Sequence, residues 1–216
     1  VYFNPAAIAS SINLRTNIIS ALQLYSKNVE INKFGGRFKY SKINQLIDRV
    51  DNGITSNITK VIIRRDLKAS LNQFAQYELC FGNRFYINPA GFNIKSTGFT
   101  VSGSDKIAYL TDVPNKDAAG NLDGSMLGTI SIVSKNNKNQ QVVLVKGAGV
   151  VDYKKGEVIL NTVNFTSTVS ENNIIEVQAY PESNDVVGLK DLFVSFNVSN
   201  STINMKEDVI ASGEDV

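Results

Sequence analysis

The sequence predicts an α+β fold, in which an N-terminal helix and a small mixed α/β unit precede a mainly antiparallel β domain. Apolar residues recur at helical spacing between Ala6 and Val50, whereas from Gln73 onward they alternate with polar residues at the period of two that is typical of strands. Segments rich in Gly, Asn and Asp separate the later runs, as expected of antiparallel strands. The change of period predicts two parts, residues 1–72 and residues 73–216, the second ending in a C-terminal tail.

Two helices are expected in the first part. Asn4-Pro5 resembles an N-cap followed by proline at the first helical position, and the helix predicted over residues 6–25 carries Ile8, Ile12, Ile19 and Leu22 at roughly helical spacing. Ser41 is a capping residue type for the second helix, which ends at Asn52-Gly53 and places on one face Ile43, Leu46, Ile47 and Val50. Extended chain with a glycine turn at Gly35-Gly36 separates the two helices.

Short β-type segments follow. We expect strands over residues 58–67, 75–81, 85–87, 92–101, 107–110, 129–133, 142–145, 157–163, 174–180 and 192–198. Two hairpins are predicted, one turning at Lys154-Lys155-Gly156 and one with its exposed tip over residues 135–141.

Composition excludes several classes of function. The 216 residues hold 22 Lys plus Arg against 20 Asp plus Glu, so neither disorder nor electrostatically driven nucleic-acid binding is indicated. The absence of His excludes Ser-His-Asp and Cys-His catalysis and removes the main nitrogen ligand of zinc sites. Cys80 is the only cysteine and sits among apolar residues, which favours a buried, inert thiol. No apolar run is long enough for a membrane span.

Three constellations could carry chemistry, and each has a simpler structural interpretation. Gly147-Ala148-Gly149 lacks the third glycine of a dinucleotide-binding turn and is followed by a β pattern instead of a helix. Asp112, Asp117 and Asp123 share a Pro- and Gly-rich segment, but their spacing does not fit a calcium loop. Asp48 and Asp51 share a helix face, which favours a solvated surface over an acid/base pair. The sequence therefore predicts no catalytic residue, cofactor, metal or small-molecule substrate.

Apolar side chains of the first part could serve either the core or a partner. The first helix has apolar residues on more than one side, and aromatic residues flank the glycine turn. As a hypothesis, we assign to a protein interface Ile12, Ile19, Leu22, Phe34 and Phe38.

Several strings resemble one protein family. Four segments of the first part carry the resemblance: Asn32-Lys33-Phe34-Gly35-Gly36-Arg37-Phe38-Lys39-Tyr40-Ser41-Lys42-Ile43, Leu46-Ile47-Asp48, residues 54–59 and Arg64-Arg65-Asp66-Leu67. They are similar to the baseplate wedge protein of contractile-tailed phages, in the baseplate J-like family. Residues 150–153, 156–160 and 181–187 resemble its β-rich C-terminal part. The stretch at Gly188-Leu189-Lys190-Asp191 departs from the family pattern, and the last 20 residues align to nothing.

The resemblance implies a structural, non-enzymatic subunit of the inner baseplate, assembled in the host cytoplasm and carried in the virion. Such proteins pair with a second copy, link wedges into a ring around the hub, and contact other wedge subunits, with no nucleic-acid, membrane or small-molecule partner. The family proteins are several hundred residues long, so we expect this chain to be part of a longer polypeptide. A carbohydrate-binding or adhesive β module of a surface protein is the alternative. A carboxylate-based hydrolase and a generic cell-surface domain are further alternatives.

Overall fold

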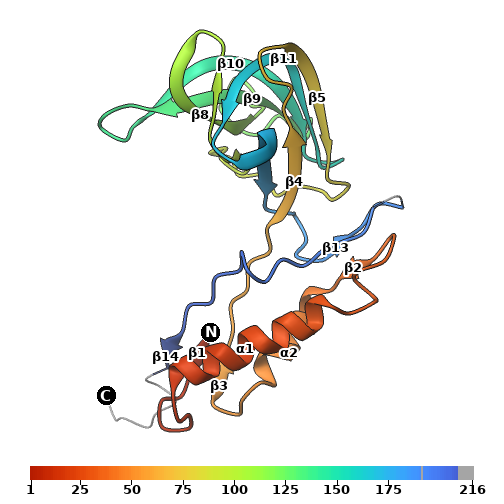
Figure 1. Cartoon of the computed structure of the whole chain (residues 1–216), viewed down its shortest axis with the longest axis vertical. Helices are drawn as coiled ribbons and strands as arrows, with labels where there is room; N and C mark the ends of the chain where they lie inside the picture. Colours follow the sequence, from red (N-terminus) through yellow and green to blue (C-terminus); the bar gives the residue numbers. More distant parts are fainter. Residues whose placement is uncertain (191, 209–216) are drawn as a thin grey trace. The chain divides into compact units, whose positions relative to one another are not determined.

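The structure is a computed structural model of the chain and describes residues 1–190 and 192–208 (Figure 1). It is mainly β with two helices, which confirms the predicted α+β class. The chain forms two compact units: unit 1 comprises Val1–Lys60 and Asn184–Val216, and unit 2 comprises Val61–Ser183. Part of the predicted C-terminal tail, residues 209–216, lies outside the described residues.

These units differ from the two consecutive parts expected from the sequence, because both ends of the chain build unit 1. Strand β1 (Tyr2–Phe3) pairs in parallel with β14 (Lys206–Glu207) and antiparallel with β3 (Ile54–Ser56). Strand β2 (Arg37–Phe38) pairs antiparallel with β13 (Val186–Val187). The C-terminal segment therefore belongs with the N-terminal helices.

Helix α1 (Ser11–Ser26) begins later than the sequence predicts. Its N-cap is Ser10, whose Oγ accepts a hydrogen bond from Asn13 N at 3.4 Å. The predicted start at Asn4-Pro5 is a turn, in which Ala6 N donates to Asn4 Oδ1 at 2.9 Å. An Asn side chain suits both a helix cap and such a turn, so the local pattern does not distinguish them.

Helix α2 (Tyr40–Asp48) lies where the periodicity places it, but its cap comes from a distant residue. Its N-cap residue is Lys39, which makes no side-chain capping bond, and Ser41 lies inside the first turn. Instead, Tyr40 N donates to Asp185 Oδ1 at 2.8 Å. The two helices contribute to the core of unit 1, in which the buried apolar residues include Leu14, Ile18, Leu22, Ile31, Phe38, Ile43 and Ile47.

Unit 2 is a closed antiparallel sheet with a smaller sheet beside it. The larger sheet has the strand order β10-β9-β8-β7-β11-β5, and an additional β10–β11 pairing closes it. Its strands are β5 (Phe74–Cys80), β7 (Phe99–Val101), β8 (Ser104–Pro114), β9 (Leu127–Lys135), β10 (Gln141–Asp152) and β11 (Glu157–Thr168). The smaller sheet consists of β4 (Ile63–Lys68), β12 (Ile174–Ala179) and β6 (Lys95–Ser96), with the short 3-10 helix η1 (Glu171–Asn173) preceding β12.

Both predicted hairpins are confirmed. Strands β10 and β11 pair from Gly149↔Leu160 to Asp152↔Glu157, and β9 and β10 enclose the exposed tip at residues 136–140. The strand expected over residues 192–198 is wrong, since among its described residues only Phe193 forms a β-bridge, to Phe34. The expected strand at 85–87 is likewise reduced to the bridge Phe85↔Pro181.

Candidate interaction surface

The five residues assigned to an interface occupy different environments in unit 1. Ile12 on α1 and Phe34 before β2 expose 75% and 69% of their surface, and Ile19 is half-buried. Leu22 and Phe38 expose only 4% and 6%. Since a side chain must be accessible to contact a partner without rearrangement, Ile12 and Phe34 remain interface candidates, whereas Leu22 and Phe38 are core residues of this unit.

Phe38 is buried because it belongs to an aromatic cluster that joins the two ends of the chain. Its ring centroid lies 6.4 Å from that of Tyr25 on α1 and 5.6 Å from that of Phe196. Tyr25 and Phe196 are themselves 6.3 Å apart in an edge-on arrangement. Edge-on and tilted rings at these separations add stabilisation beyond the buried area. The cluster thus packs the segment around Phe196 against helix α1.

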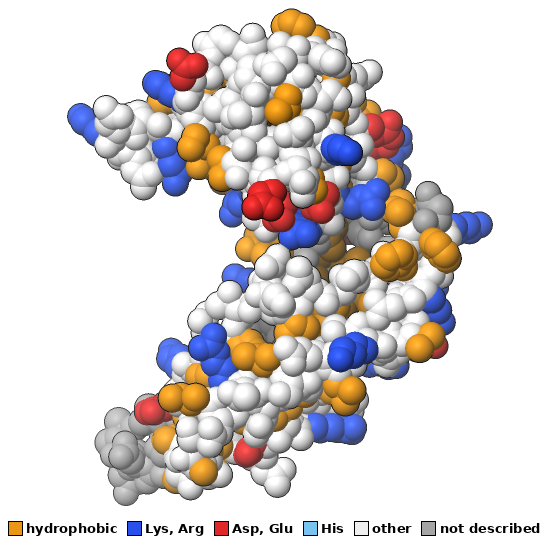
Figure 2. Space-filling model, viewed as in Figure 1, with side chains coloured by type: hydrophobic (Ala, Val, Ile, Leu, Met, Phe, Trp, Pro, Cys, Tyr) orange, Lys and Arg blue, Asp and Glu red, His pale blue; other side chains and the backbone are white. Residues whose placement is uncertain are grey.

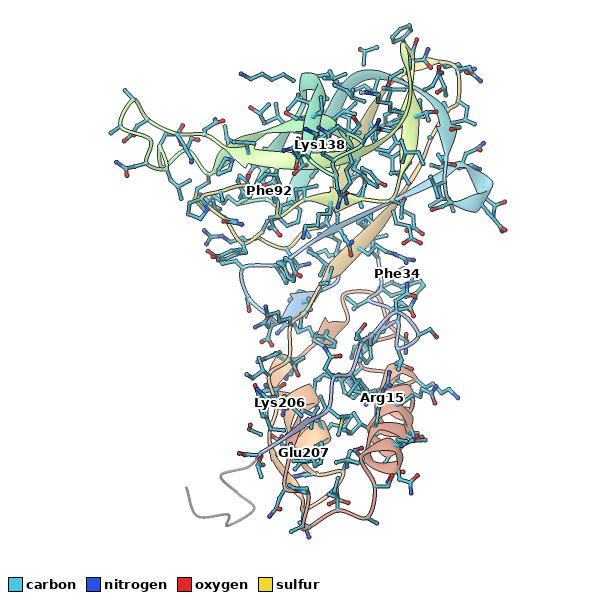
Figure 3. All side chains as sticks on the ribbon, turned by 90° about the vertical axis from the view of Figure 1, so that its left-hand side faces the viewer. Arg15, Phe34, Phe92, Lys138, Lys206 and Glu207 are labelled. Carbon is cyan, nitrogen blue, oxygen red and sulfur yellow. The ribbon has the colours of Figure 1, made fainter. Side chains whose placement is uncertain are left out.

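Phe34 forms an exposed aromatic pair with Phe193. Their ring centroids are 6.3 Å apart at 76°, and Phe193 is 60% exposed. Backbone hydrogen bonds from Gly35 N to Leu189 O and Leu192 O hold the two segments together. Two large apolar rings held in place yet open to solvent are typical of binding surfaces. Figure 3 labels Phe34.

Other apolar side chains also remain exposed. Leu24 on α1 is 76% exposed, although the sequence reasoning did not select it. In unit 2, Val142, Val143 and Val145 on β10 are exposed beside the hairpin tip. Figure 2 shows hydrophobic side chains interspersed with Lys and Arg over the visible face of the chain.

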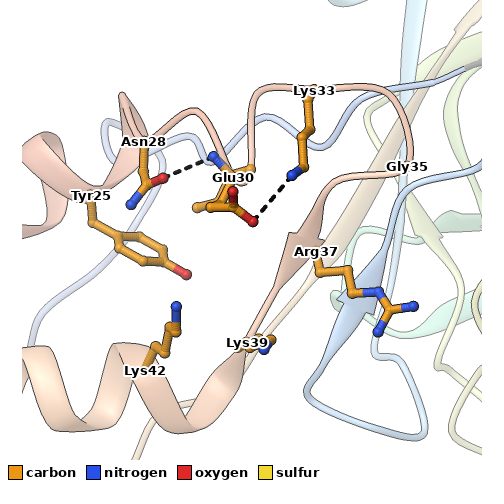
Figure 4. Close-up of a pocket in the computed structure, with 9 residues that line it drawn as sticks. Tyr25, Asn28, Glu30, Lys33, Gly35, Arg37, Lys39 and Lys42 are labelled. Carbon is orange, nitrogen blue, oxygen red and sulfur yellow. Dashed lines mark hydrogen bonds and ion pairs between the residues drawn. The ribbon is translucent and has the colours of Figure 1, made fainter.

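A pocket of about 240 Å³ lies in unit 1 between the end of α1, the glycine turn and the start of α2 (Figure 4). Its polar lining side chains are Tyr25, Asn28, Glu30, Lys33, Lys39 and Lys42, with Arg37 at its border. Burial raises the pKa of the Tyr25 hydroxyl, a backbone hydrogen bond at Lys39 lowers it to a smaller extent, and the nearby Asp185 carboxylate adds a still smaller increase. Tyr25 is therefore protonated at neutral pH and can donate.

The acidic residues weighed as catalytic or metal candidates have structural partners. Asp112 is fully buried in β8, where its carboxylate accepts from Tyr153 Oη at 2.6 Å and from Ile94 N at 2.6 Å. Burial raises the pKa of Asp112, while these hydrogen bonds act in the opposite direction. Asp117 and Asp123 lie in the exposed loop after β8 and bond to backbone N–H groups close by in that loop.

The remaining candidates also serve local structure. Asp48 Oδ1 accepts from Asn57 Nδ2 at 2.6 Å, and Asp51 Oδ1 accepts from Gly53 N at 2.7 Å. Gly147-Ala148-Gly149 lies within strand β10, as its β pattern suggests. Across the described residues, no cluster of three or more His, Cys, Asp or Glu could hold a metal ion. Neither described helix is long and apolar enough to cross a membrane.

Residues 1–66 match the family model of the baseplate structural protein gp6, C-terminal domain III. No curated protein matches the chain. The matched segment holds β1, α1, β2, α2 and β3 and reaches into β4, so it includes the pocket, Ile12 and Phe34. The match supports a structural protein of a phage tail baseplate, and it covers the part of unit 1 that precedes residue 61.

Proposed function

We propose that the chain is a structural subunit of a baseplate wedge in a contractile phage tail, akin to the baseplate J-like proteins. It pairs with a second copy, links neighbouring wedges into the inner ring around the hub and contacts other wedge subunits. It is assembled in the host cytoplasm, resides in the virion and performs no catalysis. The observation that carries this proposal is the match of residues 1–66 to a baseplate structural domain.

The surface of unit 1 supports an assembly role. Ile12, Leu24, Phe34 and Phe193 each leave 60% or more of their surface exposed. Aromatic and aliphatic anchors of this kind supply most of the binding free energy in protein interfaces. We therefore place self-association on the exposed side of α1 and on the Phe34–Phe193 pair, with Ile19 at the margin of the α1 contact.

The experiment compares the mass of the chain at micromolar and nanomolar concentrations by sedimentation. The wild-type chain is expected to form a dimer that dissociates on dilution. Ile12→Asp and Phe34→Ala should each weaken the dimer at least tenfold, because each removes an anchor from the contact, while circular dichroism stays native.

Matched controls separate the interface from general effects of substitution. Asn17→Asp adds the same charge at another exposed position of α1, and Phe74→Ala removes a ring that is 72% exposed in unit 2. Both controls should dimerise as the wild type does. A chain that is monomeric at every concentration, or variants that associate like the wild type, would remove these residues from the interface. Binding to a glycan array would instead favour the adhesive module considered from the sequence.

A further inference from the structure

The unit 1 pocket concentrates positive charge in a chain that is almost neutral. Lys33, Lys39 and Lys42 line it and Arg37 borders it, against the single acid Glu30. The whole chain carries a formal charge of only +2. Within the described residues, Lys33 is paired with Glu30 at 3.1 Å, while Arg37, Lys39 and Lys42 form no ion pair. With the Asp185 carboxylate counted as well, because it accepts from Tyr40 N and lies near Tyr25, the pocket and its border carry a net charge of about +2 near neutral pH.

The neutral groups in the pocket are also arranged to donate. Asn28 Oδ1 is occupied by the backbone N–H of Glu30 at 2.8 Å, which leaves the Asn28 Nδ2 group as the donor. The hydroxyl of Tyr25 and the ammonium group of Lys42 point toward one another across the pocket, and Lys39 lies beside them (Figure 4). Donors from separate segments thus surround one small volume, and a negatively charged group with several acceptor oxygens would complete their hydrogen bonds.

Helix α2 adds to this positive field. The positive end of the helix dipole lies at Lys39, the first turn contains no acidic residue, and Lys42 is also in that turn. Cations at this end of a helix are electrostatically unfavourable, and the Asp185 carboxylate that accepts from Tyr40 N offsets part of this repulsion. A bound anion would offset the remaining repulsion between the helix end and its two lysines.

An exposed aromatic side chain is adjacent in sequence to the pocket lining. Gly35 lines the pocket, and the preceding residue is Phe34, whose ring forms the exposed pair with Phe193. A volume of about 240 Å³ accommodates one or two side chains and is too small to follow a nucleic-acid backbone. Charge and shape together favour a short peptide segment with acidic side chains next to an apolar one.

We propose that this pocket is a docking site for an acidic segment of a partner protein, whose carboxylates enter between Lys33, Lys39 and Lys42 while an apolar side chain packs on Phe34 and Phe193. This inference deepens the assembly role proposed above and rests on it. The partner is identified by its chemistry, because complementary charge selects a carboxylate-bearing chain and the aromatic pair fixes its register.

The test uses calorimetric titration of the whole chain with the peptide acetyl-GEDFEDG-amide and its neutral counterpart acetyl-GQNFQNG-amide. The acidic peptide should bind at least tenfold more tightly, and its affinity should fall as NaCl rises from 50 to 500 mM. The double variant Lys39→Gln/Lys42→Gln should weaken binding about five- to twentyfold, since each exposed charge contact changes affinity by roughly two- to fivefold.

A control variant removes the same charge elsewhere. Lys135→Gln/Lys138→Gln neutralises two exposed lysines of the hairpin in unit 2 and should leave the affinity unchanged. Circular dichroism verifies that both variants fold, and Phe34→Ala should weaken peptide binding without abolishing its salt dependence.

Three results would overturn the inference: equal binding of the two peptides, equal affinities of the two lysine variants, or binding of inorganic phosphate or single-stranded DNA without binding of the acidic peptide. A chain that dimerises but does not bind the acidic peptide would refute the pocket alone. A chain that binds the peptide but neither dimerises nor assembles would support the pocket and refute the assembly role.

Discussion

Replacing Tyr153 with Phe tests the buried polar contact at the centre of unit 2. Tyr153 and Asp112 each have 0% exposure, and their side chains share a hydrogen bond of 2.6 Å. Tyr153→Phe preserves the ring and leaves one carboxylate oxygen without its donor. A buried hydrogen bond to a charged group contributes about 1.5–3 kcal/mol, so we expect the free energy of unfolding at pH 7 to fall by that amount. The melting temperature should fall by roughly 3–12 °C.

The same substitution should show a characteristic pH dependence. Burial raises the folded-state pKa of Asp112, so the folded protein retains this proton at pH values where the unfolded chain has lost it. The stabilisation from this group is therefore complete below about pH 4 and declines as the pH rises through the folded-state pKa. The Tyr153 hydrogen bond lowers the pKa of Asp112, which means that it favours the ionised form. Tyr153→Phe should consequently cost more at pH 7 than at pH 3.5.

Urea unfolding at both pH values, followed by circular dichroism, measures this difference. The control is Tyr109→Phe, which removes a hydroxyl from the same strand as Asp112; in the described structure that hydroxyl makes no hydrogen bond. The control should change stability by less than about 0.5 kcal/mol at either pH. Equal losses for Tyr153→Phe and Tyr109→Phe, or a loss for Tyr153→Phe that grows toward acid, would refute the reasoning.

Two further substitutions test the turn of unit 2 and the helix cap of unit 1. Gly156 has φ +70°, and an added Cβ would overlap the backbone carbonyl of Asn83, so Gly156→Ala should lower the free energy of unfolding by about 2 kcal/mol or more in urea titration; an unchanged midpoint would contradict this. Asp185→Ala removes the acceptor for Tyr40 N and should lower the free energy of unfolding by about 1 kcal/mol. Asp185→Asn keeps an acceptor oxygen and should retain most of this stability. Hydrogen exchange at the Tyr40 amide measures the cap directly and should stay slow in the Asn variant. Rapid exchange in the Asn variant as well would argue against the capping role.

Elements determined by nearby residues were predictable from the sequence. The β10–β11 hairpin depends on two β-branched runs around a glycine with positive φ, and helix α2 depends on a single clean apolar face. In both, the interactions that select the structure lie within a few positions of each other. The switch to a period of two likewise anticipated the antiparallel strands of unit 2, although the pattern could not show that β10 and β11 close the sheet.

Elements determined by distant residues were not predictable in this way. Phe38 looked equally suited to core and surface, and only Tyr25 and Phe196 make it a core residue. The strand expected over residues 192–198 has β-type alternation, but Phe193 pairs only with Phe34 and the rest of the segment lacks a strand partner among the described residues. A pattern of side chains specifies which face is apolar without specifying what covers it.

The basic pocket was not predicted from the sequence, because its residues are also brought together only by the path of the backbone. Lys33, Arg37, Lys39 and Lys42 are spread over ten residues with aromatic and glycine residues between them, so no tight basic run marks them. The turn at Gly35, with φ +65°, reverses the chain and brings Lys33 near Lys39 and Lys42. The spacing of residues along an irregular segment does not predict which of them lie close together until the path of the backbone is known.

The segment that matches the baseplate family is completed by the far end of the chain. Residues 1–66 contain the pocket and Phe34, but the partner ring Phe193, the cap Asp185 and strands β14 and β13, which pair with β1 and β2, lie beyond residue 183. Removing everything after residue 183 would leave every strand pairing of unit 2 intact, since those pairs all fall within Val61–Ser183. It would at the same time remove half of the aromatic pair and uncap α2. The proposed partner surface therefore requires both ends of the chain. We expect this truncation to abolish binding of the acidic peptide while unit 2 stays folded.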